Sequence, residues 1–270
     1  MARRVSEAIT LLGPSDPPPF TLLGEDAPSP FFLIADHAGQ IVPAALAQLG
    51  LPQGELDRHI GWDIGIAGVT RKLAALLDAT AVLQTYSRLV IDCNRPLVAP
   101  GSIPAVSDGT DIAANVAASQ TQRAQRVAEI FTPYHDAIRT QLDARVAREQ
   151  PTILLAMHSF TPVYAGIVRP WHAGVLYQRD NRLAMALKPL LEADGLVVGD
   201  NEPYAVSDQT DYAIPVHGEA RGLVHLELEI RQDLIASESG QQAWAQRLAN
   251  LLTSLEAGFT QHEVSQVLYR

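Results

Sequence analysis

The stretch FFLIADHAGQIVP, from Phe31 to Pro43, begins as an apolar run and ends in polar residues. Residues 31–35 have the length and composition of a buried strand. A carboxylate, an imidazole and a glycine follow at once, at Asp36, His37 and Gly39. Apolar strands without alternation are typical of a parallel sheet covered on both faces, and ligands bind at the carboxyl ends of such strands. The stretch therefore predicts an α/β fold and marks the functional edge of its sheet.

Strand-like and helix-like segments alternate along the rest of the chain, which favours a mostly parallel sheet with helices on both faces. The segment 97–116 is rich in Pro, Gly, Ser and Asp, and we interpret it as a long functional loop. Further strands are predicted at 81–85, 88–92, 152–157, 195–199 and 222–230, and helices at 43–50, 64–77, 118–149, 181–193 and 240–257.

Composition limits the number of domains and the kinds of partner. With 270 residues and 47% hydrophobic content, one large catalytic domain is expected at 30–270, preceded by an irregular, proline-rich leader at 1–29. A net charge of −10 disfavours nucleic acid and anionic membranes but leaves room for a small anionic substrate held by a few arginines. The single cysteine and the absence of a secretory or membrane signal make the cytoplasm the default location. Oligomeric state is left open.

Two histidines stand at predicted strand ends, His37 and His158, and two imidazoles with a carboxylate can hold a catalytic Zn²⁺. A lone histidine is more often a hydrogen-bonded cap of a strand end, and the pair leaves the two interpretations evenly balanced. Asp63 is the preferred third ligand, although an aspartate before a helix is also favoured as an N-cap. No CxxC or HExxH pattern accompanies them.

Other charged residues flank the predicted strands. Glu227 and Glu229 share one face of a strand, where either can act as a general base or pair with an arginine such as Arg221 or Arg231 at an exposed edge. For Glu227 the edge pairing is the preferred interpretation. Arg88, Asn94 and Arg95 flank another strand and suit a carboxylate ligand, with surface salt bridges as the alternative.

Six segments in this order resemble the N-formylglutamate amidohydrolase family over about residues 30–260: ADHAGQIVP, RHIGWDIG, YSRLVIDCNRP, MHSFTP, RPWHAGVLYQRD and LELEIRQDL. That family is distantly similar to zinc carboxypeptidases and aspartoacylases. The resemblance implies a three-layer α/β/α sandwich with a mixed, largely parallel central sheet, of the zinc carboxypeptidase-like, phosphorylase/hydrolase-like kind.

The resemblance also implies roles for single residues. His37 begins the metal motif, His158 is the second metal ligand, Glu229 is the general base, and the segment 92–95 supplies Asn94 and Arg95 for substrate. Gln40 stands where the motif HxxE requires a glutamate, so Asp63 is promoted to third ligand over its capping role.

The expected function is that of a metal-dependent amidohydrolase, with Zn²⁺ as the first choice, which cleaves the N-acyl amide of an acidic amino acid such as N-formylglutamate. Gln40 also permits a non-catalytic protein that binds small anions on the same fold. A zinc carboxypeptidase-like peptidase is a third alternative.

Overall fold

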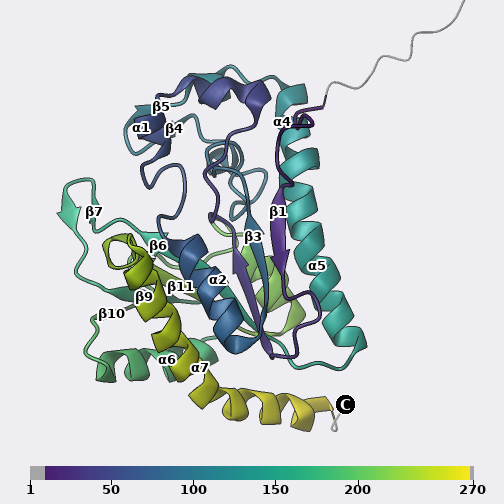
Figure 1. Cartoon of the computed structure of the whole chain (residues 1–270), viewed down its shortest axis with the longest axis vertical. Coiled ribbons are helices and arrows are strands. Elements are labelled where there is room, and N and C mark those ends of the chain that lie inside the picture. Colours follow the sequence, from purple (N-terminus) through teal and green to yellow (C-terminus); the bar gives the residue numbers. More distant parts are fainter. Residues whose placement is uncertain (1–9, 268–270) are drawn as a thin grey trace, which may run out of the picture.

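The computed structural model describes residues 10–267, and a seven-stranded sheet forms its centre (Figure 1). The strands lie in the order β1-β3-β2-β6-β11-β9-β10. Four of the neighbouring pairs are parallel, whereas β1 pairs antiparallel with β3 and β9 antiparallel with β11. The mixed, largely parallel sheet is therefore confirmed. The strands are β1 (Phe20–Leu23), β2 (Phe31–Ala35), β3 (Thr80–Gln84), β6 (Ile153–Phe160), β9 (Ala173–Leu176), β10 (Val198–Asp200) and β11 (Val224–Arg231).

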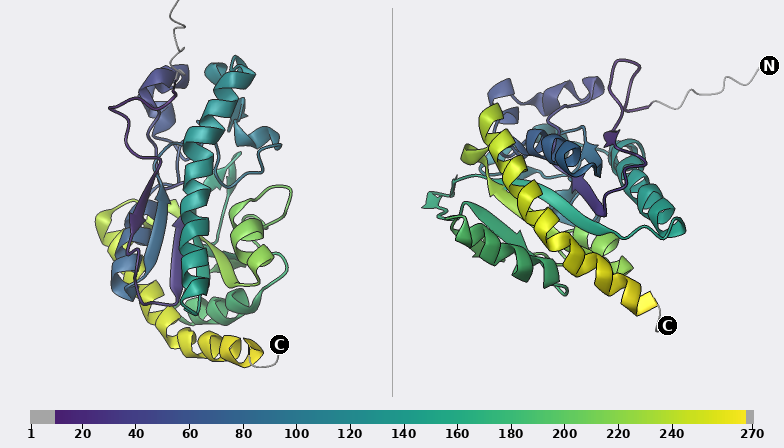
Figure 2. Two further views of the ribbon diagram at one scale, coloured as in Figure 1. Left: turned by 90° about the vertical axis from the view of Figure 1, so that its right-hand side faces the viewer. Right: turned by 60° about the horizontal axis from the view of Figure 1, so that its bottom comes forward.

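Helices cover both faces of this sheet, as Figure 1 and Figure 2 show. On one face α2 (Ile66–Leu77), α6 (Arg182–Ala193) and α7 (Glu238–Val267) enclose one hydrophobic core. On the other face α5 (Thr132–Ala147) encloses a second core. The predicted three-layer arrangement is confirmed. Shorter helices are α1 (Gln53–Leu56), α3 (Ala113–Val116) and α4 (Gln120–Arg126), with 3-10 turns at Ala44–Gly50, Pro100–Ser102, Glu219–Arg221 and Gln232–Leu234 and π turns at Val127–Phe131 and Ile214–Gly218.

The central strands are buried on both faces because alternate side chains enter different cores. In β2, Phe31 and Leu33 enter the core under α2, while Phe32 and Ile34 enter the core under α5. A strand that is buried on both sides cannot alternate between polar and apolar residues. This explains the uninterrupted apolar run with which the chain's first predicted strand begins.

Three sequence predictions were wrong, each for a physical reason. Residues 20–23 of the predicted irregular leader form β1, an edge strand, where prolines at its flanks remove no central hydrogen bond. Residues 88–92 are a buried turn segment rather than a strand, and periodicity alone does not separate a buried turn from a short buried strand. The four-residue strand β9 was not predicted. Residues 1–9 of the leader lie outside the described part of the chain.

Two small hairpins extend from the body of the domain. Within the predicted loop 97–116, β4 (Val106–Ser107) pairs with β5 (Thr110–Asp111). A second hairpin, β7 (Val163–Tyr164) and β8 (Ile167–Val168), projects at the left of Figure 1. Across residues 10–267, none of the helices has both the length and the apolar character needed to traverse a bilayer.

Candidate active site

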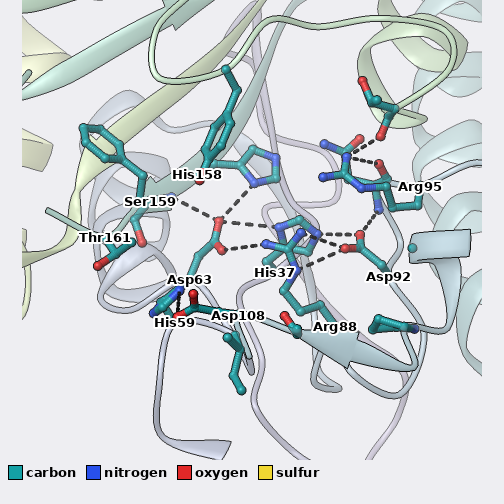
Figure 3. Close-up of a pocket in the computed structure, with 18 of the residues that line it drawn as sticks. His37, His59, Asp63, Arg88, Asp92, Arg95, Asp108, His158, Ser159 and Thr161 are labelled. Carbon is teal, nitrogen blue, oxygen red and sulfur yellow. Dashed lines mark hydrogen bonds and ion pairs between the residues drawn. The ribbon is translucent and has the colours of Figure 1, made fainter. Parts of the chain in front are cut away.

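A cavity of about 480 Å³ opens at the carboxyl ends of β2, β6 and β11. These strands run parallel to one another, so the residues at their ends meet at one edge of the sheet. The loop 97–116 contributes Gly101, Pro104 and Asp108 to its lining, in agreement with the functional role predicted for it. Figure 3 shows residues that line the cavity.

His37, Asp63 and His158 converge at this edge, and we call them the histidine–aspartate cluster. The two imidazole centroids are 4.9 Å apart. Asp63 Oδ2 lies 3.5 Å from Nδ1 of His37 and 3.0 Å from Nδ1 of His158. One ligand atom from each of the three residues lies within 4.8 Å of the others, and all three residues are buried. The sequence prediction that these three residues meet is confirmed, although their role as metal ligands stays a prediction.

Asp63 does not act as an N-cap, so the capping interpretation was wrong. Helix α2 begins at Ile66, its N-cap is Gly65, and no side chain caps it. The Asp63 carboxylate instead accepts the backbone N–H of Ser159 at 3.0 Å and lies between His158 and His37 in Figure 3. Because the Asp63 carboxylate is not used to cap α2, it is available to the two histidines and to a bound ligand.

Two further carboxylates hold the far sides of the imidazole rings. Asp92 Oδ1 lies 2.7 Å from Nε2 of His37, and Asp36 Oδ2 lies 3.4 Å from Nε2 of His158. Such outer carboxylates fix the tautomer and orientation of metal-bound histidines. The sequence analysis gave neither residue a separate role. The sequence feature that could have identified Asp36 and Asp92 is a carboxylate at the end of a buried segment, because a buried carboxylate requires a partner.

The residues present fit a divalent metal. His37 Nδ1 is buried and has no hydrogen-bond partner among the described residues, although a bound ion would give it one. Two imidazoles and one carboxylate form the ligand set of an open zinc site. Burial opposes ionisation of Asp63, but His37 and His158 outweigh it and lower its pKa, so this carboxylate is an anion that can bind a cation.

Glu229 and Glu227 project from β11 beside the cluster, and both are buried. Glu229 is paired in register with His158 of the adjacent strand, and its Oε2 has no hydrogen-bond partner among the described residues. Burial raises the pKa of Glu229 to about 8 and that of Glu227 to about 7. The edge pairing preferred for Glu227 was wrong, since its Oε2 accepts from Asn94 Nδ2 at 3.3 Å. Arg221 and Arg231 instead pair with Asp143 and Asp233.

Arg88, Asn94 and Arg95 line the same cavity. Arg88 donates from Nη2 to Asp92 at 2.7 Å and from Nη1 to Asp63 at 3.5 Å. Asn94 accepts the backbone N–H groups of Tyr212 and Ala213. Arg95 bonds through Nη1 to Asp211 Oδ1 at 3.3 Å, and no partner for its Nε or Nη2 is found among residues 10–267. These residues therefore border the cavity, and their role in binding a substrate stays a prediction.

Gln40, at the position where HxxE requires a glutamate, takes no part in the cluster. It lines a separate cavity together with Trp62 and Arg71. Gly39 is required for another reason, because a Cβ there would lie 1.9 Å from the carbonyl oxygen of Thr85. The carboxylate nearest the two histidines is that of Asp63, and its role as third ligand stays a prediction.

Comparisons with known proteins agree with this geometry. A family model described as N-formylglutamate amidohydrolase matches residues 29–236. The solved structure of gene product Atu2144 from Agrobacterium tumefaciens is 33% identical and superposes with a TM-score of 0.89, covering 92% of this chain and 98% of that one. The structure of an N-formylglutamate amidohydrolase from Ralstonia eutropha JMP134 is 19% identical and superposes with a TM-score of 0.67. The match covers 90% of this chain and 99% of that one, and at this identity it supports the fold alone. No curated protein matches the chain.

Proposed function

Because the chain belongs to the N-formylglutamate amidohydrolase family and is therefore a hydrolase of linear amide bonds, we propose that it is a metal-dependent enzyme that releases the acyl group from an N-acyl acidic amino acid. N-formylglutamate is the first candidate substrate. The observation that carries the proposal is the convergence of His37, Asp63 and His158 beside the unpartnered carboxyl of Glu229.

His37, Asp63 and His158 would hold the metal, with Zn²⁺ preferred because imidazole and carboxylate ligands suit it. When bound, such an ion polarises the acyl carbonyl and lowers the pKa of water. Asp92 and Asp36 keep the two imidazoles oriented with Nδ1 toward the site.

Glu229 is the proposed general base. Its Oε2 is free to take the proton from the attacking water and to pass it to the leaving amide nitrogen. A pKa near 8 suits this exchange, because the carboxyl both accepts and releases a proton at neutral pH. Arg88, fixed by Asp92 and Asp63, is the proposed donor to the developing oxyanion.

Arg95 and Asn94 are the proposed contacts to the amino-acid part of the substrate. The unengaged Nε and Nη2 of Arg95 form the fork that binds a carboxylate at two points. Asn94 holds Glu227 and the segment at 212–213 and so shapes this side of the cavity. The cytoplasm remains the expected compartment, in keeping with the buried free thiol of Cys93.

The non-catalytic alternative was motivated by Gln40, and the carboxylate of Asp63 beside the two histidines weakens that motivation. The test is metal content together with formate release. The purified protein is expected to contain about one equivalent of zinc and to release formate from N-formyl-L-glutamate. A protein that binds no divalent metal, or that hydrolyses no N-acyl amino acid after zinc loading, contradicts the proposal.

A further inference from the structure

Asp36 is a fully buried carboxylate that few neighbouring groups can hold in place. Neither of its oxygens has a hydrogen-bond partner among the described residues. Its one ion pair within that part of the chain is with His158, whose Nε2 lies 3.4 Å from Oδ2. Burial opposes ionisation of Asp36, but His158 outweighs it and lowers its pKa, so the group is an anion. A buried anion is costly unless donors point at it, and Asp36 therefore requires a donor at its other oxygen.

Asp92, the outer carboxylate of the other imidazole, has such donors. Arg88 donates to its Oδ2 from Nε at 3.1 Å and from Nη2 at 2.7 Å. The backbone N–H of Asn94 donates to its Oδ1 at 2.9 Å. These bonds fix the carboxylate that orients His37. Because Asp36 has the same task at the second imidazole, we expect it to have an anchor of its own.

The hydroxyl of Tyr134, on α5, is the candidate donor. Tyr134 is fully buried, and its hydroxyl is without a hydrogen-bond partner among the described residues. Burial and, after it, the charge of Asp36 raise the pKa of Tyr134 well above its usual value, so the hydroxyl keeps its proton. The backbone of Ala35 acts on the same hydroxyl, which places it at the end of β2. An unpartnered donor and an unpartnered acceptor are thus neighbours in one dry core.

The other polar groups near Asp36 are already engaged. His135 also acts on this carboxylate, but both of its ring nitrogens are bonded to other groups. Both ring nitrogens of His37 face other carboxylates. Within the described part of the chain, Tyr134 is the donor that remains for the second oxygen of Asp36.

We propose that Tyr134 is a positioning residue for the metal site: its hydroxyl donates to one oxygen of Asp36 and so holds the other oxygen against Nε2 of His158. An imidazole that donates from Nε2 presents the lone pair of its Nδ1 to a cation. Tyr134 does not line the cavity, and it acts only through Asp36. The inference rests on the proposed function, since it concerns the metal site of that reaction.

The principal test is Tyr134→Phe, which removes one buried oxygen and keeps the ring. The zinc dissociation constant, measured by competition with a chelator, is expected to rise about tenfold, at the lower end of the effect of outer groups on metal affinity. Tyr86→Phe is the matched control, because Tyr86 is equally buried in the same core and its hydroxyl donates to the carbonyl oxygen of Pro17. The control should change the constant by less than about twofold.

A double-mutant cycle separates positioning from general damage to the core. Asp36→Ala removes the carboxylate through which Tyr134 acts. In that background, adding Tyr134→Phe is expected to change the zinc dissociation constant by less than about twofold. The same loss of affinity in both backgrounds overturns the inference, as does an unchanged constant in the single variant Tyr134→Phe.

A second readout requires no metal. In metal-free, ¹⁵N-labelled protein, the imidazole nitrogen signals of His158 are expected to shift in Tyr134→Phe and to stay in place in Tyr86→Phe. Unmoved His158 signals in Tyr134→Phe overturn the inference and leave the proposed function intact. Wild-type protein that binds no zinc refutes the proposed function, whereas the nitrogen signals still decide the role of Tyr134.

Should Tyr134→Phe fail to fold, the hydroxyl proton of Tyr134 in the wild-type protein provides the decision. A hydroxyl that donates to a buried carboxylate gives a downfield proton signal that exchanges slowly with water, and Asp36→Ala is expected to move this signal upfield. The absence of such a signal, or the same signal in both proteins, overturns the inference.

Discussion

The histidine–aspartate cluster and the aromatic wall, by which we mean Arg169 and the rings of Phe160, Tyr164 and Tyr204, compensate their charges in different ways. The cluster and the three rings line one cavity, and Arg169 packs against the rings without lining it. In the cluster each imidazole is held between Asp63 and an outer carboxylate, Asp92 or Asp36. In the wall, Arg169 has aromatic rings and neutral oxygens around it and no carboxylate from the described residues. The cluster is thus pre-organised by the protein itself, as a metal site requires. The guanidinium of the wall is held by neutral groups, as are those of the buried Arg126 and Arg145.

Removing a cluster histidine is expected to have the largest effect. His37→Ala should lose zinc and lower kcat/KM on the order of 10³-fold or more, because the metal contributes several kcal/mol to the transition state. Zinc is measured by mass spectrometry and the fold by circular dichroism. His59→Ala is the control, since His59 lines the cavity outside the cluster. Full zinc occupancy in His37→Ala would show that the cluster is no metal site.

Replacement of the general base comes next. Glu229→Gln should retain zinc and lower kcat by about 10²–10⁴-fold, the usual contribution of a general base. Glu227→Gln is the matched control, because Glu227 lies on the same strand face with a partner in Asn94. If Glu227→Gln proves the more damaging change, the roles of the two carboxyls have been exchanged.

The cluster was predictable from the sequence because its histidines lie at the ends of apolar strands. His37 lies two residues beyond the end of β2, and His158 lies near the carboxyl end of β6. Strand direction then brings both to one edge. Asp63 was identified only with the help of a family resemblance, since its sequence context equally favours a cap. Its actual contacts reach residue 159, and no local pattern carries that information.

The wall was not predictable in the same way. Arg169 follows a two-residue strand in an exposed hairpin, and Tyr204 lies in a loop far along the chain. Their 2.8 Å contact depends on how β9 and β10 join the sheet, and β9 was itself missed. A short antiparallel strand leaves no periodic signal, so the loops that it positions cannot be placed beforehand. The same limit explains why β1 was read as part of an irregular leader.

The pH dependence of stability tests the charge state of the cluster's surroundings. Burial raises the pKa of Glu229 to about 8 from 4.5, so the folded protein holds a proton that the unfolded chain loses between these values. Stability of the metal-free protein should therefore fall as the pH rises from about 4.5 to 8. A glutamine side chain does not titrate, and Glu229→Gln should therefore raise the free energy of unfolding by roughly 2–4 kcal/mol at about pH 8.

The increase in the free energy of unfolding caused by Glu229→Gln is measured by urea unfolding at several pH values in the presence of chelator. It should be small near pH 4 and grow toward pH 8. Glu227→Gln should show a gain that levels off about one pH unit earlier, because the pKa of Glu227 is raised only to about 7. A stability increase that is independent of pH would mean that packing, and not burial of charge, causes the difference between the glutamine variants and the wild type.

The smallest expected effect compares two arginines directly. Arg95 has Asp211 as an internal counter-ion, whereas Arg169 has none among the described residues. A substrate carboxylate at Arg95 must therefore share the guanidinium with Asp211, and its net contribution to binding free energy is reduced.

Arg95→Lys keeps the charge but removes the fork, so it should raise KM for N-formyl-L-glutamate about tenfold, equivalent to about 1.4 kcal/mol, with kcat nearly unchanged. Steady-state kinetics on the diacid and on its two monoamides provide the measurement. The monoamide that lacks the carboxylate contacted by Arg95 should be insensitive to Arg95→Lys. If Arg95→Lys raises KM equally for the diacid and for both monoamides, Arg95 contacts neither carboxylate and supports the cavity wall through Asp211 instead.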